Sequence, residues 1–435
     1  MKKTPYQIAT IAAGLSIGSI ASAQSIYLNP SQAATNNALL NANSWWSDAA
    51  GTTANTTTLT TATGSYILNF NNLVTSTSGF TGRTGGGSGG SFFVSGIVVS
   101  NPAGDIRMTT ASNAVQTVTL AGAVGIDLSA ATKNFTFQAG STTSNTGTLR
   151  IGGGTSSTWK IQEGRTLTIG TNTNVTAQAA GKTLTITGNG TTGLGNVVFN
   201  GNVGSSSLAL AINGTGTNSS GGNVSFNGAA NGLGSLTITN ATANFASGGT
   251  TPGTVTVNSG GVLAGTGTLS GAVTVNGSLR PNTAPANAAS RINFSNASSS
   301  LTLNSSATTT FDLDGANYTG VTSTGATAFN GALAINLINS LSTGTYSYNL
   351  FDFGSQSGSF SSVGITSVGS LTRNGASSGT GTWSGNYGLS SYQFSESDGV
   401  LGITVSAIPE PSTWAAFAGL SGLAFAAGRR RRRAA

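Results

Sequence analysis

Short segments with an apolar residue at every second position recur between residues 91 and 280. Examples are Gln116–Leu120, Arg165–Ile169, Lys182–Ile186 and Ser235–Thr239. This alternation places the apolar side chains on one face of a β-strand and Thr or other polar side chains on the opposite face. Gly and Asn next to these segments permit the positive φ angles that tight corners need. The pattern predicts an all-β chain of many short strands.

Two of the segments return almost unchanged further along the chain. Gly195–Gly201 returns as Gly222–Gly228, and Thr254–Asn258 returns after a shorter interval as Ala272–Asn276. One unit of this size cannot bury its apolar face alone, whereas stacked units bury a continuous core. We therefore expect a parallel β-helix, that is, a β-solenoid. An antiparallel sandwich or barrel is the alternative, because hairpins also use Asn-Gly turns.

Residues 1–23 have the three parts of a secretory signal peptide. Two lysines precede a short, mostly apolar stretch, Ile8–Ile20, and Ala21 and Ala23 supply small residues at the −3 and −1 positions. We expect export by the Sec machinery and cleavage before Gln24. A buried N-terminal helix is the alternative interpretation.

The C-terminus also has three parts. Pro409, Glu410 and Pro411 precede an uncharged run, Ser412–Gly428. As a helix this run would span about 25 Å, just short of the hydrocarbon core of a membrane. The positive-inside rule would keep the basic residues that follow in the cytoplasm. We expect one C-terminal hydrophobic helix that acts as a transient inner-membrane anchor. The basic tail consists of Arg429, Arg430, Arg431, Arg432 and Arg433.

These three features, in this order at the terminus, resemble the PEP-CTERM sorting signal. The resemblance implies that an exosortase, a membrane-embedded protease, recognises Pro409–Pro411 and removes the anchor. Such signals occur in exported bacterial proteins made together with extracellular polymer, so an extracellular polysaccharide is an expected partner.

The stretch Gly253–Leu279 resembles the autotransporter-associated β-strand repeat, which alternates Val-rich strands with Gly-Gly-x-Leu and Gly-Thr-Gly-Thr turns. The match ends at Asn282, where the family pattern has Gly. Strands that usually follow this repeat are expected at Phe311–Leu313, Gly331–Ile335 and Tyr346–Phe353. The resemblance implies a right-handed parallel β-helix of the passenger type.

The chain therefore divides into five expected regions. They are a signal peptide (1–23), an N-terminal polar region with short strands (24–90), the β-solenoid repeats (91–300, with the autotransporter-type repeat at about 253–282), a C-terminal β region (301–407) and the sorting segment (408–435).

The excess of positive charge lies at the two ends of the chain. The net charge of the whole chain is +7, yet between residues 24 and 408 there are 10 Lys and Arg against 9 Asp and Glu, a net charge of +1. Nucleic-acid binding needs clustered basic residues, so it is not expected. The chain has no Cys and no His, which excludes the usual zinc sites and the Cys–His and Ser–His nucleophiles. We expect no cofactor and no metal.

The nearest set of candidate catalytic residues is Asp312 and Asp314, with Asp352 further along. Carboxylates at positions i and i+2 of a strand share a face and can perturb each other's pKa. Polysaccharide-cleaving β-helices use such residues. We favour the simpler interpretation, in which both are ordinary outward residues before a turn at Gly315, and expect no catalytic site.

Thr-x-Thr pairs such as Thr166/Thr168 and Thr237/Thr239 suggest ice binding, because a flat Thr array can order water. Thr is also an ordinary residue on an exposed strand face, and the pairs are few and irregularly spaced in the sequence. The expected function is therefore that of a non-enzymatic structural or adhesive protein, located at the cell surface, outer membrane or extracellular matrix. The alternatives are a glycan- or ice-binding β-helix and, third, a polysaccharide-degrading enzyme.

Overall fold

The structure is a computed structural model of the 435-residue chain. It describes residues 23–29, 39, 44–55, 66–77, 80–83, 91–110, 116–139, 146–152, 156–190, 193–204, 208–214, 222–228, 232–246, 253–281, 290–295, 300–375, 381–407 and 411–431.

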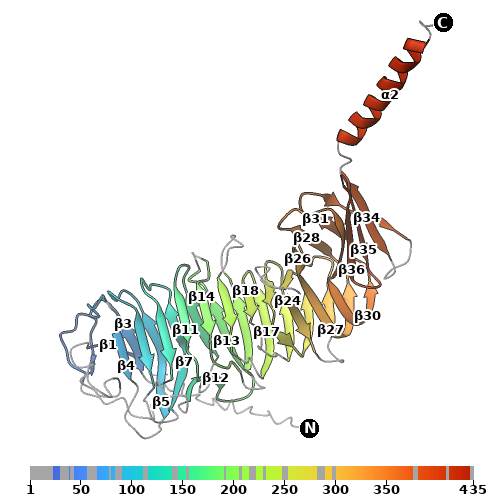
Figure 1. Ribbon diagram of the computed structural model, residues 1–435. Helices are drawn as coiled ribbons and strands as arrows, with labels where there is room; N and C mark the ends of the chain where they lie inside the picture. Colours follow the sequence, from blue (N-terminus) through green and yellow to red (C-terminus); the bar gives the residue numbers. More distant parts are fainter. Residues whose placement is uncertain are drawn as a thin grey trace, which may run out of the picture.

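The body is a parallel β-solenoid whose coils stack into two long ladders and a short third one (Figure 1). Ladder 1 is parallel throughout and contains β3 (Tyr66–Phe70), β5 (Ser91–Val99), β7 (Gln116–Leu128), β10 (Ser157–Ile161), β13 (Lys182–Thr187), β15 (Leu208–Asn213), β17 (Leu233–Thr239), β19 (Thr254–Val257), β22 (Ala272–Val275), β25 (Leu301–Leu303), β27 (Asn317–Phe329) and β30 (Phe351–Gly358).

Ladder 2 follows ladder 1 within each coil and is also parallel. It contains β4 (Phe80–Arg83), β6 (Ile106–Thr109), β8 (Phe135–Gln138), β11 (Thr166–Ile169), β14 (Asn196–Phe199), β16 (Asn223–Phe226), β18 (Thr242–Phe245), β20 (Val262–Gly265), β23 (Ser278–Pro281), β26 (Thr308–Asp314), β28 (Ala332–Leu337) and β31 (Ser362–Ile365).

A third ladder forms only in part. Near the N-terminal end β9 (Gly147–Ile151) pairs with the first half of β7, and β12 (Thr173–Ala177) pairs with β9. Near the other end β24 (Ser290–Phe294) pairs with the first half of β27, and β21 (Thr268–Leu269) pairs with β24.

The repeats seen in the sequence set the stacking. Val197 pairs with Val224, and Thr254 pairs with Ala272, so the two copies of each repeated segment lie directly side by side. The predicted β-solenoid is confirmed, and the antiparallel alternative is wrong for this body because its ladders pair in parallel.

The core is one continuous stack of inward-facing apolar side chains. Along ladder 2 the rings of Phe199, Phe226 and Phe245 stack with centroids 5.4 and 4.6 Å apart. Such contacts between like residues in successive coils hold the coils in register.

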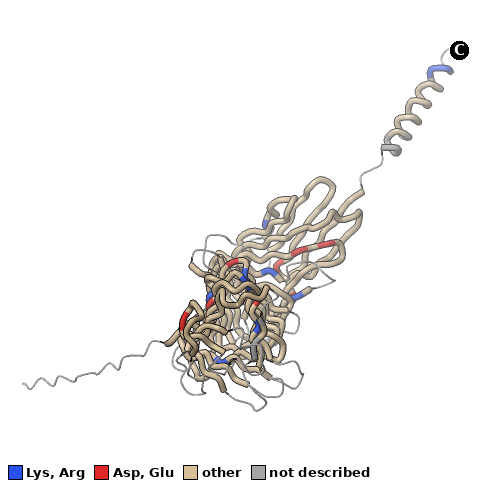
Figure 2. The backbone as a smooth tube through the Cα atoms, turned by 90° about the vertical axis from the view of Figure 1, so that its left-hand side faces the viewer, with Lys and Arg blue, Asp and Glu red and all other residues tan. Residues whose placement is uncertain are grey.

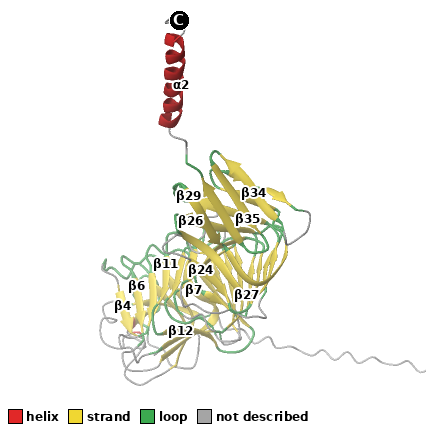
Figure 3. Cartoon of the chain, turned by 45° about the vertical axis from the view of Figure 1, so that its right-hand side comes forward, coloured by secondary structure: helices red, strands yellow, loops and turns green. Residues whose placement is uncertain are grey.

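Both ends of the stack are covered. At the N-terminal end β1 (Gln24–Leu28) runs parallel to β3 and antiparallel to β2 (Trp45–Trp46). At the other end β32 (Gly369–Ser370) pairs antiparallel with β31. Beyond it an antiparallel sheet, here called the end sheet, packs on the last coils (Figure 3). In spatial order the end sheet contains β29 (Gly344–Asn349), β36 (Val400–Val405), β35 (Ser390–Ser395), β34 (Thr382–Tyr387) and β33 (Thr372–Asn374).

Among the described residues, one α-helix, α2 (Pro411–Arg431), forms where a C-terminal helix was expected. Its Phe417, Leu420, Leu423 and Phe425 side chains are all exposed, and in Figure 1 it stands away from the solenoid. Among the described residues, no helix combines the length and the apolar character needed to cross a membrane.

Candidate functional site

A column of outward-facing side chains runs along ladder 1. Its members occupy the same position in seven successive strands, from β10 to β25, and six of the seven are threonines. We call this set the threonine column; it consists of Thr158, Thr185, Ala211, Thr237, Thr256, Thr274 and Thr302.

Each member of the threonine column alternates with buried residues of the same strand and is partly exposed. Neighbouring strands of a sheet lie about 4.8 Å apart, so the column presents hydroxyl and methyl groups at a regular repeat. A second column of small side chains runs beside it through Thr183, Ala209 and Ser235. Neither column contains a charged residue.

The threonines are irregularly spaced in the sequence, yet they form a regular column in the structure. The connection from Thr256 to Thr274 is much shorter than the one from Thr274 to Thr302, yet each of these residues pairs directly with the next. The differences in length are taken up between strands, while the strands keep their register. Of the two pairs named from the sequence, Thr237 belongs to the column, whereas Thr166 and Thr168 lie on ladder 2.

Asparagines continue the polar pattern where ladder 1 turns toward ladder 2. The side-chain amide of Asn258 donates to the hydroxyl of Thr239 over 3.0 Å, and that of Asn304 donates to Oδ1 of Asn276 over 2.7 Å. Side-chain ladders of this kind tie one coil to the next and fix the edge of the face.

The acidic candidates on β26 each have hydrogen-bond partners of their own. Asp312 is only 1% exposed, because neighbouring side chains cover it, although its position on the strand points outward. Its Oδ2 lies 3.1 Å from Nη2 of Arg280, and its Oδ1 accepts a 2.7 Å hydrogen bond from Asn336. Asp312 thus occupies the outward position that was expected, but its carboxylate is buried and paired with Arg280 and Asn336.

The other two acidic candidates have different neighbours. Asp314 follows Asp312 on β26 and accepts a 2.6 Å hydrogen bond from Asn339. Asp352 lies on β30, where it pairs with Thr322 on ladder 1 rather than with ladder 2. Within the described residues, no cluster of three or more His, Cys, Asp or Glu is present that could hold a metal ion.

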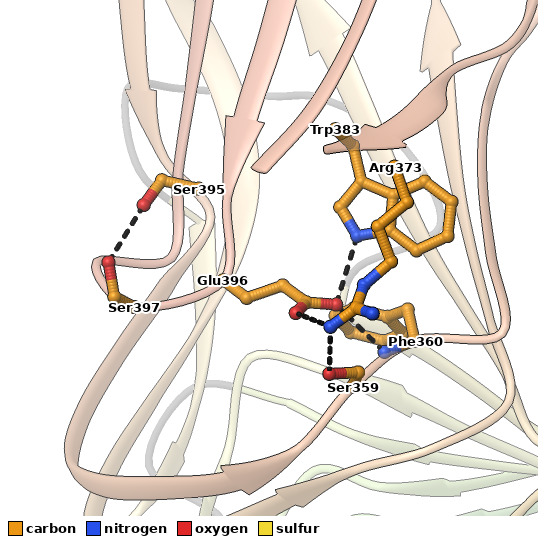
Figure 4. A network of polar contacts seen from close by, with 7 residues as sticks. All are labelled: Ser359, Phe360, Arg373, Trp383, Ser395, Glu396 and Ser397. Carbon is orange, nitrogen blue, oxygen red and sulfur yellow. Dashed lines mark hydrogen bonds and ion pairs between the residues drawn. The ribbon is translucent and has the colours of Figure 1, made fainter. Parts of the chain in front are cut away.

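A buried carboxylate in the end sheet has no counterpart in the sequence-based predictions. Glu396 is fully buried; its Oε1 accepts hydrogen bonds from the indole N–H of Trp383 over 2.9 Å and from the backbone N–H of Phe360 over 3.0 Å (Figure 4). Its Oε2 lies 3.4 Å from Nη2 of Arg373, which also donates to Ser359. Phe360 belongs to the last coil, whereas Trp383 and Arg373 belong to the end sheet. The carboxylate of Glu396 therefore joins the last coil to the end sheet.

The residues expected to direct export are only partly within the described ranges. Ala23 is described, and Gln24 is the first residue of β1. Pro411 begins α2, and Arg429, Arg430 and Arg431 lie in its last turn. Ala21, Asn282, Pro409, Glu410, Arg432 and Arg433 lie outside the described residues.

Comparison with known proteins adds nothing to these observations. No family model matches the chain, and no curated protein matches it. The resemblances to an autotransporter-type repeat and to a PEP-CTERM signal therefore stay predictions.

Proposed function

We propose that the chain is an exported, non-enzymatic protein of the cell surface or extracellular matrix that adheres to uncharged, regularly repeating surfaces through the threonine column. The column carries this proposal, because a long row of identical donors and acceptors suits a periodic target better than a single small molecule. Each hydroxyl both donates and accepts, and each methyl group adds apolar contact.

Sparse charge supports adhesion without electrostatic attraction. Figure 2 shows only scattered basic and acidic residues along the body, and both buried acids described above are already paired. A polysaccharide-cleaving site would need several carboxylates and bases in one groove.

Export and sorting form the second part of the proposal. A signal peptide would end before Gln24, and an exosortase-type protease would cut at Pro409–Pro411. The position of Gln24 supports this boundary, since the first strand among the described residues, β1, would then start at the first residue of the mature chain. Cell fractionation with mass spectrometry of the mature C-terminus tests it; Arg429–Arg433 retained on an extracellular product would contradict sorting.

Ice binding is the second candidate, and the regularity of the same column favours it. A row of Thr hydroxyls and methyls with a constant repeat can order water as an ice-like lattice does. Thermal hysteresis measured on the same preparation distinguishes the two candidates.

One pair of variants tests whether the threonine column is the binding surface. Thr237→Tyr places a bulky ring in the middle of the threonine column, and Thr168→Tyr places the same ring on the outward face of ladder 2 as the control. We expect Thr237→Tyr to lower co-sedimentation with crystalline cellulose about fivefold or more, equivalent to roughly 1 kcal/mol, and Thr168→Tyr to leave it unchanged. Equal effects of the two substitutions, or no binding by the unmodified protein to either cellulose or ice, would contradict the proposal.

A further inference from the structure

A hollow lies where ladder 2 ends against the end sheet. Its volume is about 370 Å³, within the usual range for a small-molecule site. We call it the junction hollow. Its walls are the segment that follows β28, the turn after β31, the hairpin between β34 and β35, and the end of β36; they comprise Leu337–Leu341, Thr366–Val368, Tyr387, Ser390, Tyr392 and Val405.

The lining of the junction hollow is mixed and carries no charge. Hydroxyl and amide groups come from Asn339, Ser340, Thr366, Ser367 and Ser390. Aromatic and aliphatic surface comes from the neighbouring side chains Tyr387, Tyr392, Ile338, Leu341 and Val368. An apolar wall with a few fixed polar groups is the usual composition of a specific ligand site.

Large exposed apolar side chains gather at this hollow. Among the described residues ahead of α2, the large apolar side chains that are exposed are Tyr387 (58%), Ile338 (49%) and Leu389 (47%). Tyr387 and Ile338 line the hollow, and Leu389 lies between Tyr387 and Ser390 on the same hairpin. Exposed apolar surface concentrated at one place indicates an interaction site.

The polar groups at the rim are held in place by their neighbours. The Asn339 amide donates to Oδ1 of Asp314 over 2.6 Å, which fixes the amide and leaves its carbonyl oxygen as an acceptor. The Thr366 hydroxyl donates to Oδ1 of Asn336 over 2.7 Å. Ser367 has a φ of 67°, a left-handed conformation that is unusual for a residue other than Gly and Asn and occurs at binding sites more often than elsewhere.

We propose that the junction hollow binds a neutral oligosaccharide. The exposed ring of Tyr387 would pack against the apolar C–H face of a pyranose, while Asn339 and Ser367 exchange hydrogen bonds with its hydroxyls. An acidic sugar or an anionic peptide would find no cation among the lining residues. The site goes beyond the proposed adhesion, because it lies on a different surface from the threonine column.

Titration calorimetry of the whole protein with soluble oligosaccharides tests this proposal. Cellotetraose, laminaritetraose and mannotetraose represent neutral ligands, and trigalacturonate represents an acidic one. Tyr387→Ala removes the ring, Tyr387→Phe keeps it, and Leu389→Ala is the control, since Leu389 is comparably exposed but does not line the hollow. Denaturation midpoints verify that all three variants fold.

We expect at least one neutral tetrasaccharide to bind, with a Kd raised about tenfold or more by Tyr387→Ala and changed less than about twofold by Tyr387→Phe or Leu389→Ala. Binding of trigalacturonate alone, no binding at millimolar concentration, or equal loss in Leu389→Ala would overturn the proposal. So would a Tyr387→Ala effect on self-association in place of sugar binding. Failure here leaves adhesion by the threonine column standing, because Thr237→Tyr tests that surface separately.

Discussion

Glu396 shows what a single buried charge does in a chain with so few of them. Its carboxylate is the common acceptor for Trp383, Phe360 and Arg373, which come from three separate segments. Nothing in the sequence around Glu396 distinguishes it from the exposed acidic residue Asp398 two positions later. Its role could not be predicted, because its partners come from other strands and turns that only the folded chain brings together.

Replacing Glu396 is expected to loosen the end sheet. Glu396→Ala leaves Arg373 without its ionic partner and leaves two buried N–H groups without an acceptor, which should lower the free energy of unfolding by about 3 kcal/mol. Glu396→Gln keeps one acceptor oxygen and should cost clearly less. Urea denaturation followed by tryptophan fluorescence measures both values; equal losses would show that the ionic contact, not the acceptor, matters.

Tyr348 makes the stability of the end sheet depend on pH in the alkaline range. Burial raises the pKa of its hydroxyl from 10.0 to about 12, with a smaller contribution from the neighbouring Tyr346, and the hydroxyl donates to the carbonyl of Gly315 over 2.7 Å. Because the folded pKa is raised, the stabilisation is complete below pH 10 and is lost as the pH rises toward about 12.

Unfolding free energies measured from pH 9 to 12 test this directly. The unmodified protein should lose stability across the upper part of this range more steeply than Tyr348→Phe, which has no proton to lose at that position. Parallel curves for the two proteins would contradict the assignment.

At the scale of elements, alternation and repeats predicted the strands well. β7, β11, β13 and β17 each contain most of a segment expected from the sequence. The order in which strands stack was predictable only where two copies of a repeated segment are nearly identical in sequence, as in β14 and β16. The threonine column was missed because its members are unevenly spaced along the chain, and register is a property of the stack rather than of any one strand.

Corners of the coils depend on close backbone contact. A Cβ placed on Gly222, just before β16, would lie 1.8 Å from the carbonyl oxygen of Gly195 in the preceding coil, whereas one on Gly193 would meet nothing closer than 3.6 Å. Gly222→Ala must therefore push two coils apart, and we expect a loss of about 2 kcal/mol or more. Gly193→Ala, the control, should change the unfolding free energy by less than about 0.5 kcal/mol. Similar losses for both would argue against tight stacking at this corner.

At the scale of the whole molecule, the alternating pattern and the repeats predicted the all-β class and the solenoid. They could not predict the junction hollow, whose walls come from the last coils and from a sheet that follows them. The junction requires the end sheet to pack on ladder 2, and no local pattern at Tyr387 or Ser367 specifies that contact.

A body with a net charge of +1 should adhere independently of salt. Raising NaCl from roughly 0.05 to 0.5 M screens electrostatic attraction. Binding that does not rely on this attraction should survive the change, so we expect co-sedimentation of a chain ending at Ala407 with cellulose to change less than about twofold. The full chain, which keeps the five terminal arginines, is the comparison. A steep loss of binding by the shorter chain would show that its few charges dominate adhesion.

The uneven lengths of the coils have a further consequence for how this molecule can change. The ladders keep their pairing both across the short connection from Thr256 to Thr274 and across the longer one from Thr274 to Thr302. The connections can therefore grow or shrink without moving the columns. Insertions at the connections would add new loops along the rod while its faces stay constant. Because of the same tolerance, foreign peptides could be inserted into the connections and displayed at chosen positions along the solenoid axis.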